Sequence, residues 1–182
     1  LGRTLLARAM RAGVPVSGPA QEMGESVLRL RDPDGIIVKL VGLEMPAEAP
    51  LDYPPAPTRI RGVTILTDNA ETVAGFLHRF GYAEQRRDGP FIRMASDSDV
   101  VDIRGSAGFV TGGQGTGVFD HVAFRAPDVE AVRAMRLALR DHDGATAVHD
   151  RKYFMSLYVR EPTGTLFEYA TDAPGFTVDE PA

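Results

Sequence analysis

A carboxylate in the middle of an apolar strand is the first sign of chemistry in this sequence. The segment GTLFEYATD, residues 164–172, alternates as a strand and places Glu168 on the same face as Leu166 and Ala170. Those two neighbours are expected core residues, and a carboxylate among core residues is costly unless something pairs with it. We expect the partner of Glu168 to be a metal ion.

A histidine provides the second candidate ligand. His121 lies in VFDHVAFRA, residues 118–126, which reads as another strand of the same repeat unit. An imidazole nitrogen and a carboxylate oxygen suit a divalent first-row metal, and a face of two histidines and one carboxylate with open positions suits non-heme Fe(II). His121 and Glu168 alone leave an alternative open, in which they form a buried hydrogen-bonded pair without a metal.

Two further candidates lie just before and within the expected strand 153–160. Tyr158 could donate a proton or a hydrogen bond to a bound phenolate, and Arg151 could hold an anionic oxygen. Tyr158 could instead be a core tyrosine with its hydroxyl at the rim. Arg151 could instead form a surface ion pair with Asp150 or Asp172.

Three other histidines and a glycine-rich segment have simpler interpretations. His78 reads as partly buried packing, His142 as a solvated residue after a helix, and His149 as a strand-edge side chain. The segment 105–117 lacks the Gly-Lys-Ser/Thr ending of a phosphate-binding loop and is followed by a strand. A nucleotide site is therefore not expected there.

Composition limits the class of protein. The 182 residues have a net charge of −5, so no basic surface for nucleic acid is expected. There are no cysteines, which excludes disulfides and thiolate metal sites. No apolar run approaches the roughly 20 residues of a membrane span, and no signal peptide is evident. The expected location is the cytoplasm.

The chain is expected to have three parts. Residues 1–42 read as the C-terminal part of a truncated module, 43–58 as a proline-rich linker, and 59–182 as two paired modules, 59–104 and 118–171, with a C-terminal tail. The expected helices are 1–12, 69–81 and 127–144. The expected strands are 26–31, 35–42, 59–67, 90–95, 99–104, 118–126, 145–149, 153–160 and 164–171.

An internal repeat defines these modules. The turn Asp32–Gly35 aligns with residues 161–164, which are 129 positions later, and the same offset aligns Lys39 with Glu168. RGVTI (61–65) aligns with DHVAF (120–124), which pairs Gly62 with His121. Repeats of this kind bury a shared face between copies. The predicted fold is α+β, with repeated βαβββ modules pairing into a curved mixed sheet around a cavity that holds a metal site.

These residues together resemble the vicinal oxygen chelate superfamily, which includes glyoxalases, bleomycin-resistance proteins and extradiol dioxygenases. Within it the chain is most similar to ring-cleaving dioxygenases that open hydroquinones. The resemblance is carried by DHVAF (120–124), by DRKYFMSLYVREPTGTLFEYATD (150–172) and by PGFTVDE (174–180). RLRDPDGIIVKLVG (29–42) matches the superfamily more widely.

The resemblance implies an enzyme that uses Fe(II), or alternatively Mn(II), to cleave a small aromatic substrate with O2. His121 and Glu168 match two of that family's three metal ligands, and Arg151 and Tyr158 match residues that position substrate and assist proton transfer. No nucleic acid or membrane partner is implied, and a homodimer is an expected assembly because such modules often pair edge to edge.

The chain departs from the family pattern at two places. Asp120 replaces a histidine that usually precedes the metal-ligating histidine. The third ligand of the hydroquinone-cleaving branch is a histidine in the first module, which we expect upstream of Leu1, so the chain reads as a fragment. Without such a ligand the site would be incomplete and inactive. The alternatives are a metal-free protein that binds an aromatic molecule or antibiotic, and a glyoxalase-like isomerase or lyase using Zn or Ni.

Overall fold

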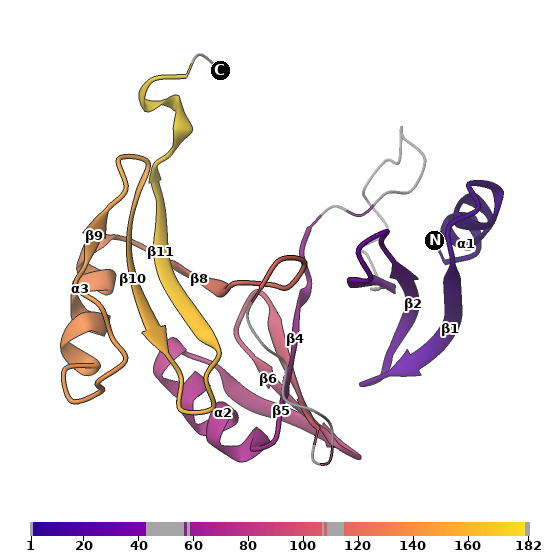
Figure 1. The fold of residues 1–182 in the computed structure, drawn as a ribbon, viewed down its shortest axis with the longest axis horizontal. Helices are drawn as coiled ribbons and strands as arrows, with labels where there is room; N and C mark the ends of the chain where they lie inside the picture. The colour runs from indigo at the N-terminus through magenta and orange to yellow at the C-terminus, as the bar shows by residue number, and fades with distance from the viewer. Residues whose placement is uncertain (1, 43–56, 58, 107, 109–114, 181–182) are drawn as a thin grey trace.

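The strands of the described residues divide into three hydrogen-bonded sheets (Figure 1). The fold is that of a computed structural model, which describes residues 2–42, 57, 59–106, 108 and 115–180. Almost all of the expected linker 43–58 lies outside the described residues. Among the described residues, no helix is both long and apolar enough to cross a membrane.

The first sheet is a three-stranded antiparallel meander that follows helix α1 (Gly2–Arg11). Its strands are β1 (Val16–Glu22), β2 (Glu25–Arg31) and β3 (Ile37–Gly42). The sequence pattern missed β1, because VSGPAQE has no apolar alternation and is exposed along most of its length.

The second sheet has the strand order β4-β7-β6-β5, with β4 parallel to β7. Asn69 caps the helix after β4 as predicted, since its side chain accepts a hydrogen bond from the Thr72 amide at 3.1 Å. Strand β5 was not predicted, because AEQRRD is mostly polar and is exposed at every position. The elements are β4 (Gly62–Thr67), α2 (Ala70–Leu77), the 3-10 helix η1 (His78–Phe80), β5 (Ala83–Asp88), β6 (Phe91–Ala95) and β7 (Val100–Gly105).

The third sheet repeats this order as β8-β11-β10-β9, with β8 parallel to β11. Strand β8 begins at Val122, so His121 directly precedes the strand instead of lying within it. The helix ends at Ala138, several residues before the predicted end at Gly144. The elements are β8 (Val122–Ala126), α3 (Val129–Ala138), β9 (His149–Asp150), β10 (Phe154–Arg160), β11 (Leu166–Pro174) and the 3-10 helix η2 (Phe176–Val178).

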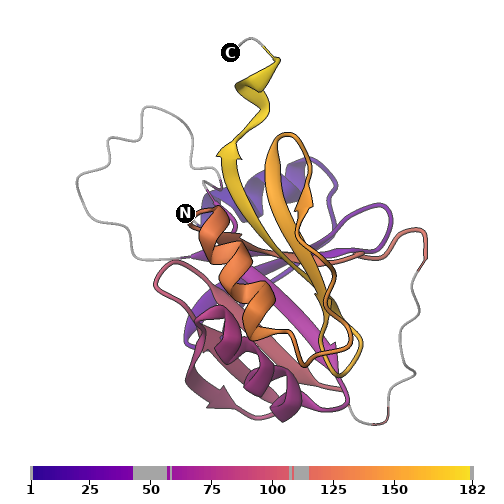
Figure 2. The ribbon, with the colours of Figure 1, turned by 90° about the vertical axis from the view of Figure 1, so that its left-hand side faces the viewer.

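One hydrophobic core joins the second and third sheets. Helices α2 and α3 lie together on the outside of the two sheets (Figure 2). Beneath them, aromatic rings of α2 and η1 pack against rings of β8 and β11, with ring centroids 4.9 Å apart for Phe80 and Phe124 and 6.0 Å apart for Phe76 and Phe167. The predicted α+β class with mixed sheets is confirmed, although the strands form separate sheets rather than one continuous curved sheet.

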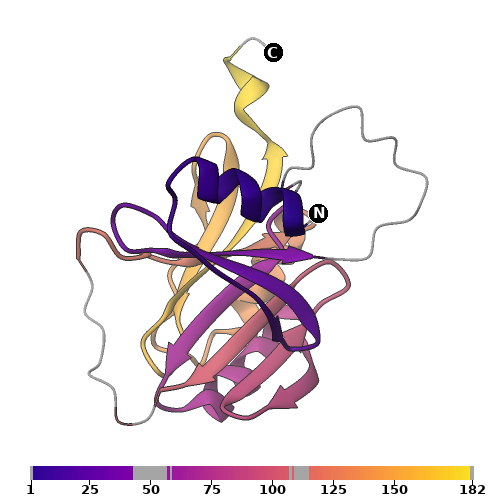
Figure 3. The same cartoon turned by 90° about the vertical axis from the view of Figure 1, so that its right-hand side faces the viewer.

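Polar contacts join the first sheet to the second. The sheet β1–β3 and helix α1 cover the side of the molecule away from α2 and α3 (Figure 3). The Glu25 carboxylate binds Arg61 at 3.0 Å and Arg93 at 2.7 Å, and Lys39 Nζ donates to Thr64 Oγ1 at 3.2 Å. These contacts hold β2 and β3 against the face of the second sheet that its helix does not cover.

Candidate functional site

The alternation of β11 separates a core face from a polar face. Phe167 is fully buried in the core beneath the helices, and Tyr169 packs against the same core. Glu168 points to the opposite face, yet it is only 5% exposed. Leu166 and Ala170 are half-buried there, so the expectation that they belong to the main core was wrong. Glu168 therefore lies on the face opposite the helices.

His121 meets Glu168 on this face. The imidazole Nε2 atom is 3.1 Å from Glu168 Oε2, and the Nδ1 atom is 2.8 Å from Asp120 Oδ2. The parallel pairing of β8 with β11 explains the meeting, because Val122, the residue after His121, is in register with Phe167, the residue before Glu168. The imidazole thus lies between two carboxylates, each facing a different ring nitrogen.

The unpaired oxygen of Glu168 makes the pair suitable for a cation. Glu168 Oε1 is buried and has no hydrogen-bond partner among the described residues. A buried carboxylate oxygen without a partner is costly, and a bound cation would remove that cost. The imidazole and carboxylate also suit iron or manganese. The described residues contain no group of three or more His, Cys, Asp or Glu side chains that could complete such a site.

Tyr158 stands next to both of these residues. It is directly opposite Glu168 in the antiparallel pairing of β10 with β11. Its ring meets the His121 ring edge to face, with 5.6 Å between centroids. Burial and, after it, the nearby Glu168 carboxylate raise the pKa of the Tyr158 hydroxyl above its ordinary value of 10.0. Tyr158 is therefore a neutral hydrogen-bond donor at physiological pH.

Arg151 extends the group. Its guanidinium carbon lies 5.7 Å from the centroid of the Tyr158 ring. The two carboxylates considered as alternative partners are engaged elsewhere: Asp172 binds Arg125 at 2.7 Å, and Asp150 accepts a hydrogen bond from the Lys152 amide at 2.7 Å. The structure thus brings together all four residues singled out in the sequence.

The remaining histidines are not part of this group. His78 is exposed, which differs from the expected partial burial. His142 Nε2 lies 2.7 Å from the Arg160 carbonyl oxygen, and its ring packs on Phe76, so it is more than a solvated residue. His149 begins β9, opposite Ser156, consistent with a strand-edge position.

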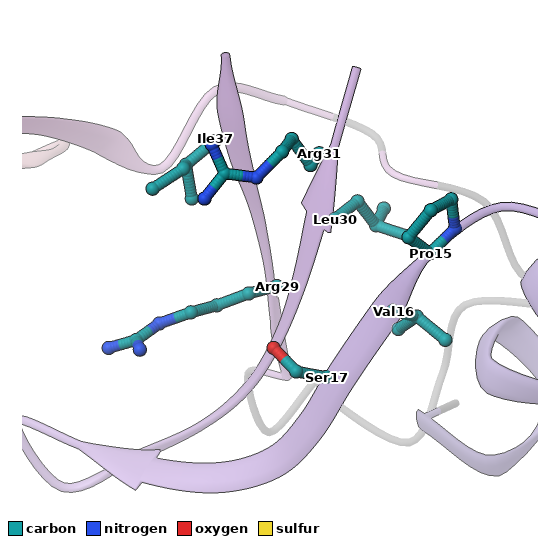
Figure 4. Close-up of a pocket in the computed structure, with 7 residues that line it drawn as sticks. All are labelled: Pro15, Val16, Ser17, Arg29, Leu30, Arg31 and Ile37. Carbon is teal, nitrogen blue, oxygen red and sulfur yellow. The ribbon is translucent and has the colours of Figure 1, made fainter. Parts of the chain in front are cut away.

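The first sheet carries a hollow of about 320 Å³, which is separate from the candidate site (Figure 4). It forms beside β1 and β2, and none of the four candidate site residues lines it. Its lining residues are Pro15, Val16, Ser17, Arg29, Leu30, Arg31 and Ile37.

The equivalent positions of the first sheet carry two cations that share one carboxylate. In the pairing of β2 with β3, Arg29 stands opposite Lys39, just as Tyr158 stands opposite Glu168. Both cations bind the Glu22 carboxylate, at 2.7 and 3.0 Å. These positions are occupied by an ion-pair cluster.

The equivalent positions of the second sheet also leave no free carboxylate oxygen and no room for a histidine side chain. Arg93 stands opposite Asp102 and binds both of its carboxylate oxygens, at 2.6 and 2.8 Å. Gly62, the counterpart of His121, lies so close to β7 that a Cβ atom would be 2.0 Å from the Val100 carbonyl oxygen. Within the described part of the chain, only the third sheet combines a histidine with a buried carboxylate that lacks a full set of partners.

Two polar groups of the site were not given roles from the sequence. Asp120 was noted only as a departure from the family pattern, and its contact with His121 Nδ1 depends on the backbone path before β8. Ser156 precedes Tyr158 by two residues on the same strand face, and its hydroxyl is buried without a hydrogen-bond partner among the described residues. Ser156 could have been predicted from the sequence, because it lies two residues before Tyr158 and therefore on the same face of the strand.

Known proteins with similar sequences are ring-cleaving dioxygenases by name. The chain is 30% identical over 170 residues to "Putative ring-cleaving dioxygenase MhqO" of Bacillus subtilis, and this alignment covers 88% of the chain and 54% of the relative. It is 30% identical over 190 residues to "Chlorohydroquinone/hydroquinone 1,2-dioxygenase" of Sphingobium indicum, covering 94% and 58%. The chain spans about half the length of these curated relatives. No protein-family model matches the sequence.

Solved structures show the same fold. A dioxygenase structure from Bacillus subtilis, itself described as putative, superposes with a TM-score of 0.84 at 30% identity, covering 96% of this chain and 59% of that one. A glyoxylase/bleomycin resistance protein/dioxygenase domain from Frankia superposes with a TM-score of 0.54 at 13% identity, covering 66% and 96%. The resemblance to the vicinal oxygen chelate superfamily is therefore confirmed.

Proposed function

We propose that this chain is part of a ring-cleaving dioxygenase that uses O2 to open a hydroquinone or related phenol, with Fe(II), or alternatively Mn(II), at His121 and Glu168. The observation that supports the proposal most directly is the 3.1 Å approach of His121 Nε2 to a Glu168 carboxylate whose second oxygen is buried and unpaired. The names of relatives at about 30% identity support the same reaction class.

His121 and Glu168 would hold the metal, which supplies a Lewis-acidic and redox-active centre where an aromatic hydroxyl and O2 can meet. His121 is 32% exposed in its side chain, so this face remains accessible to a small ligand.

Tyr158 and Arg151 would act on the substrate. The raised pKa of Tyr158 keeps its hydroxyl protonated, so it can donate to a substrate oxygen and return the proton when charge shifts. The Arg151 guanidinium, held over the Tyr158 ring, would stabilise negative charge on the same side of the substrate. Both groups come from one strand and the turn before it, so they would be positioned together.

Internal symmetry suggests the source of a third ligand. Lys39, the counterpart of Glu168, reaches Thr64 on the first strand of the neighbouring module. If Glu168 relates to its neighbour as Lys39 does, it would face the first strand of another module. That module would cover the third sheet in the way that β1–β3 covers the second sheet. In the full-length protein, residues upstream of Leu1 would supply that strand and a third metal ligand.

Two measurements on the full-length protein test this proposal. Protein purified without oxygen should contain close to one equivalent of iron or manganese, and it should change the absorbance of a hydroquinone through ring cleavage in the presence of O2. A protein that binds phenols tightly but holds no metal under these conditions would instead be a binding protein of the same fold.

A further inference from the structure

We propose that Asp120 is a positioning residue that fixes the orientation of His121 and raises its affinity for a metal ion. The inference rests on the proposed function, because it concerns the same site. It assigns a role to a carboxylate at the position where the resembled dioxygenases usually carry a histidine.

The geometry supports this role. Asp120 Oδ2 lies 2.8 Å from His121 Nδ1, while Nε2 of the same ring faces Glu168 at 3.1 Å. Asp120 thus approaches the ring nitrogen that is directed away from Glu168. When Nε2 is free to bind a metal, the remaining ring proton must be on Nδ1, where the Asp120 carboxylate accepts it.

Histidine ligands depend on such a partner. A hydrogen bond from the other ring nitrogen to a carboxylate fixes the tautomer and the ring orientation, and it makes the ligating nitrogen more basic. Loss of such a partner typically costs about 10–100-fold in metal affinity. His121 lies one residue before β8, and the contact with Asp120 adds a constraint on its ring.

A purely structural role for Asp120 is disfavoured by its exposure. The side chain is 75% exposed, and a polar contact so accessible to water contributes little to folding stability. Its replacement should therefore leave the fold intact while changing the properties of His121.

The test uses the full-length protein and three variants. Asp120→Ala removes the acceptor, Asp120→Asn keeps an acceptor but removes the charge, and Asp143→Ala is a matched control at an exposed aspartate after α3. Dissociation constants are measured for Mn(II) and for Zn(II), a diamagnetic probe. Nitrogen-15 NMR of the Zn(II)-loaded protein then reports the Nδ1–H group of His121.

The expected result is a 10–100-fold weaker affinity in Asp120→Ala, a smaller loss in Asp120→Asn, and no change in Asp143→Ala. The strongly hydrogen-bonded Nδ1–H signal of His121 should disappear in Asp120→Ala. Unchanged affinity and an unchanged signal in Asp120→Ala would overturn the inference. If the wild-type protein binds neither metal at His121, the proposed function itself fails, which is a distinguishable outcome.

Discussion

Tyr158 and Glu168 stand directly opposite each other across the antiparallel pair of β10 and β11. Their side chains therefore lie on the same face of the sheet, and no change of a single rotamer can separate them widely. His121 reaches the same carboxylate from the residue just before the neighbouring parallel strand β8, so the order β8-β11-β10 brings one group of side chains together. The site is defined by sheet register and is correspondingly rigid.

The same register produces a structural ion pair in the second sheet, and its removal should be costly. Replacing Arg93 with Leu leaves Asp102 and Glu25 without their shared cation, and the Arg93 side chain is only 6% exposed. Breaking a buried pair from one side costs about 3–5 kcal/mol of unfolding free energy. Urea denaturation measures this loss. Arg133→Leu, at an exposed ion pair with Glu130, is the control and should change stability little.

Gly62 is expected to tolerate no side chain. In Gly62→Ala the new Cβ would lie 2.0 Å from the Val100 carbonyl oxygen, so β4 could not keep its place beside β7. The expected loss exceeds about 3 kcal/mol of unfolding free energy, at the upper end of overpacking effects. Gly75→Ala is the opposite control, since that site in α2 has open space and the variant should gain about 0.5–1 kcal/mol. Equal effects in thermal or urea unfolding would contradict the described contact of β4 with β7.

Tyr158→Phe should keep the metal and slow turnover. Removal of one proton donor typically costs about 10²–10⁴-fold in rate. A raised pKa means that the wild-type hydroxyl stays protonated to higher pH, so an activity loss due to its ionisation should appear only above the ordinary tyrosine value. The variant should lack that alkaline loss. A rate equal to wild type would make Tyr158 a packing residue.

Arg151→Gln should weaken substrate binding more than it affects metal binding. The substitution keeps a polar side chain but removes the cation that lies over the Tyr158 ring. One charged hydrogen bond contributes about 1.5–3 kcal/mol, so KM for a hydroquinone should rise about 10-fold or more with metal content unchanged. Lys152→Gln, at the adjacent residue whose ammonium binds Asp179 instead, is the matched control. If both variants gave the same KM, Arg151 would have no specific role at the site.

The sequence predicted which polar side chains lie near one another better than it predicted the edges of the fold. Glu168 was recognisable because a carboxylate that interrupts an apolar alternation needs a partner, and the turn repeat identified the equivalent position in another module. Both copies of that turn keep the same hydrogen bond, from Gly35 to Asp32 and from Gly164 to Glu161.

The missed elements carry no local signal. Strands β1 and β5 were overlooked because each is an exposed edge strand that depends on its neighbour for pairing rather than on its own apolar pattern. The polar clusters at Glu25 and Arg93 were also missed, since residues 68 positions apart meet only when two sheets face each other. Such contacts depend on tertiary placement, which alternation along a strand does not encode.

The central claim is that His121 and Glu168 hold one divalent cation. It is tested most directly by titrating metal-depleted, full-length protein with Fe(II) without oxygen, alongside Glu168→Gln and the exposed control Glu130→Gln. We expect wild type and Glu130→Gln to bind one equivalent of iron. Glu168→Gln should keep its circular dichroism spectrum but bind iron more than about 100-fold more weakly. This loss exceeds the one expected when a residue that only orients a metal ligand is removed. Undiminished iron binding by Glu168→Gln would show that this carboxylate is no ligand and that the proposed metal site is wrong.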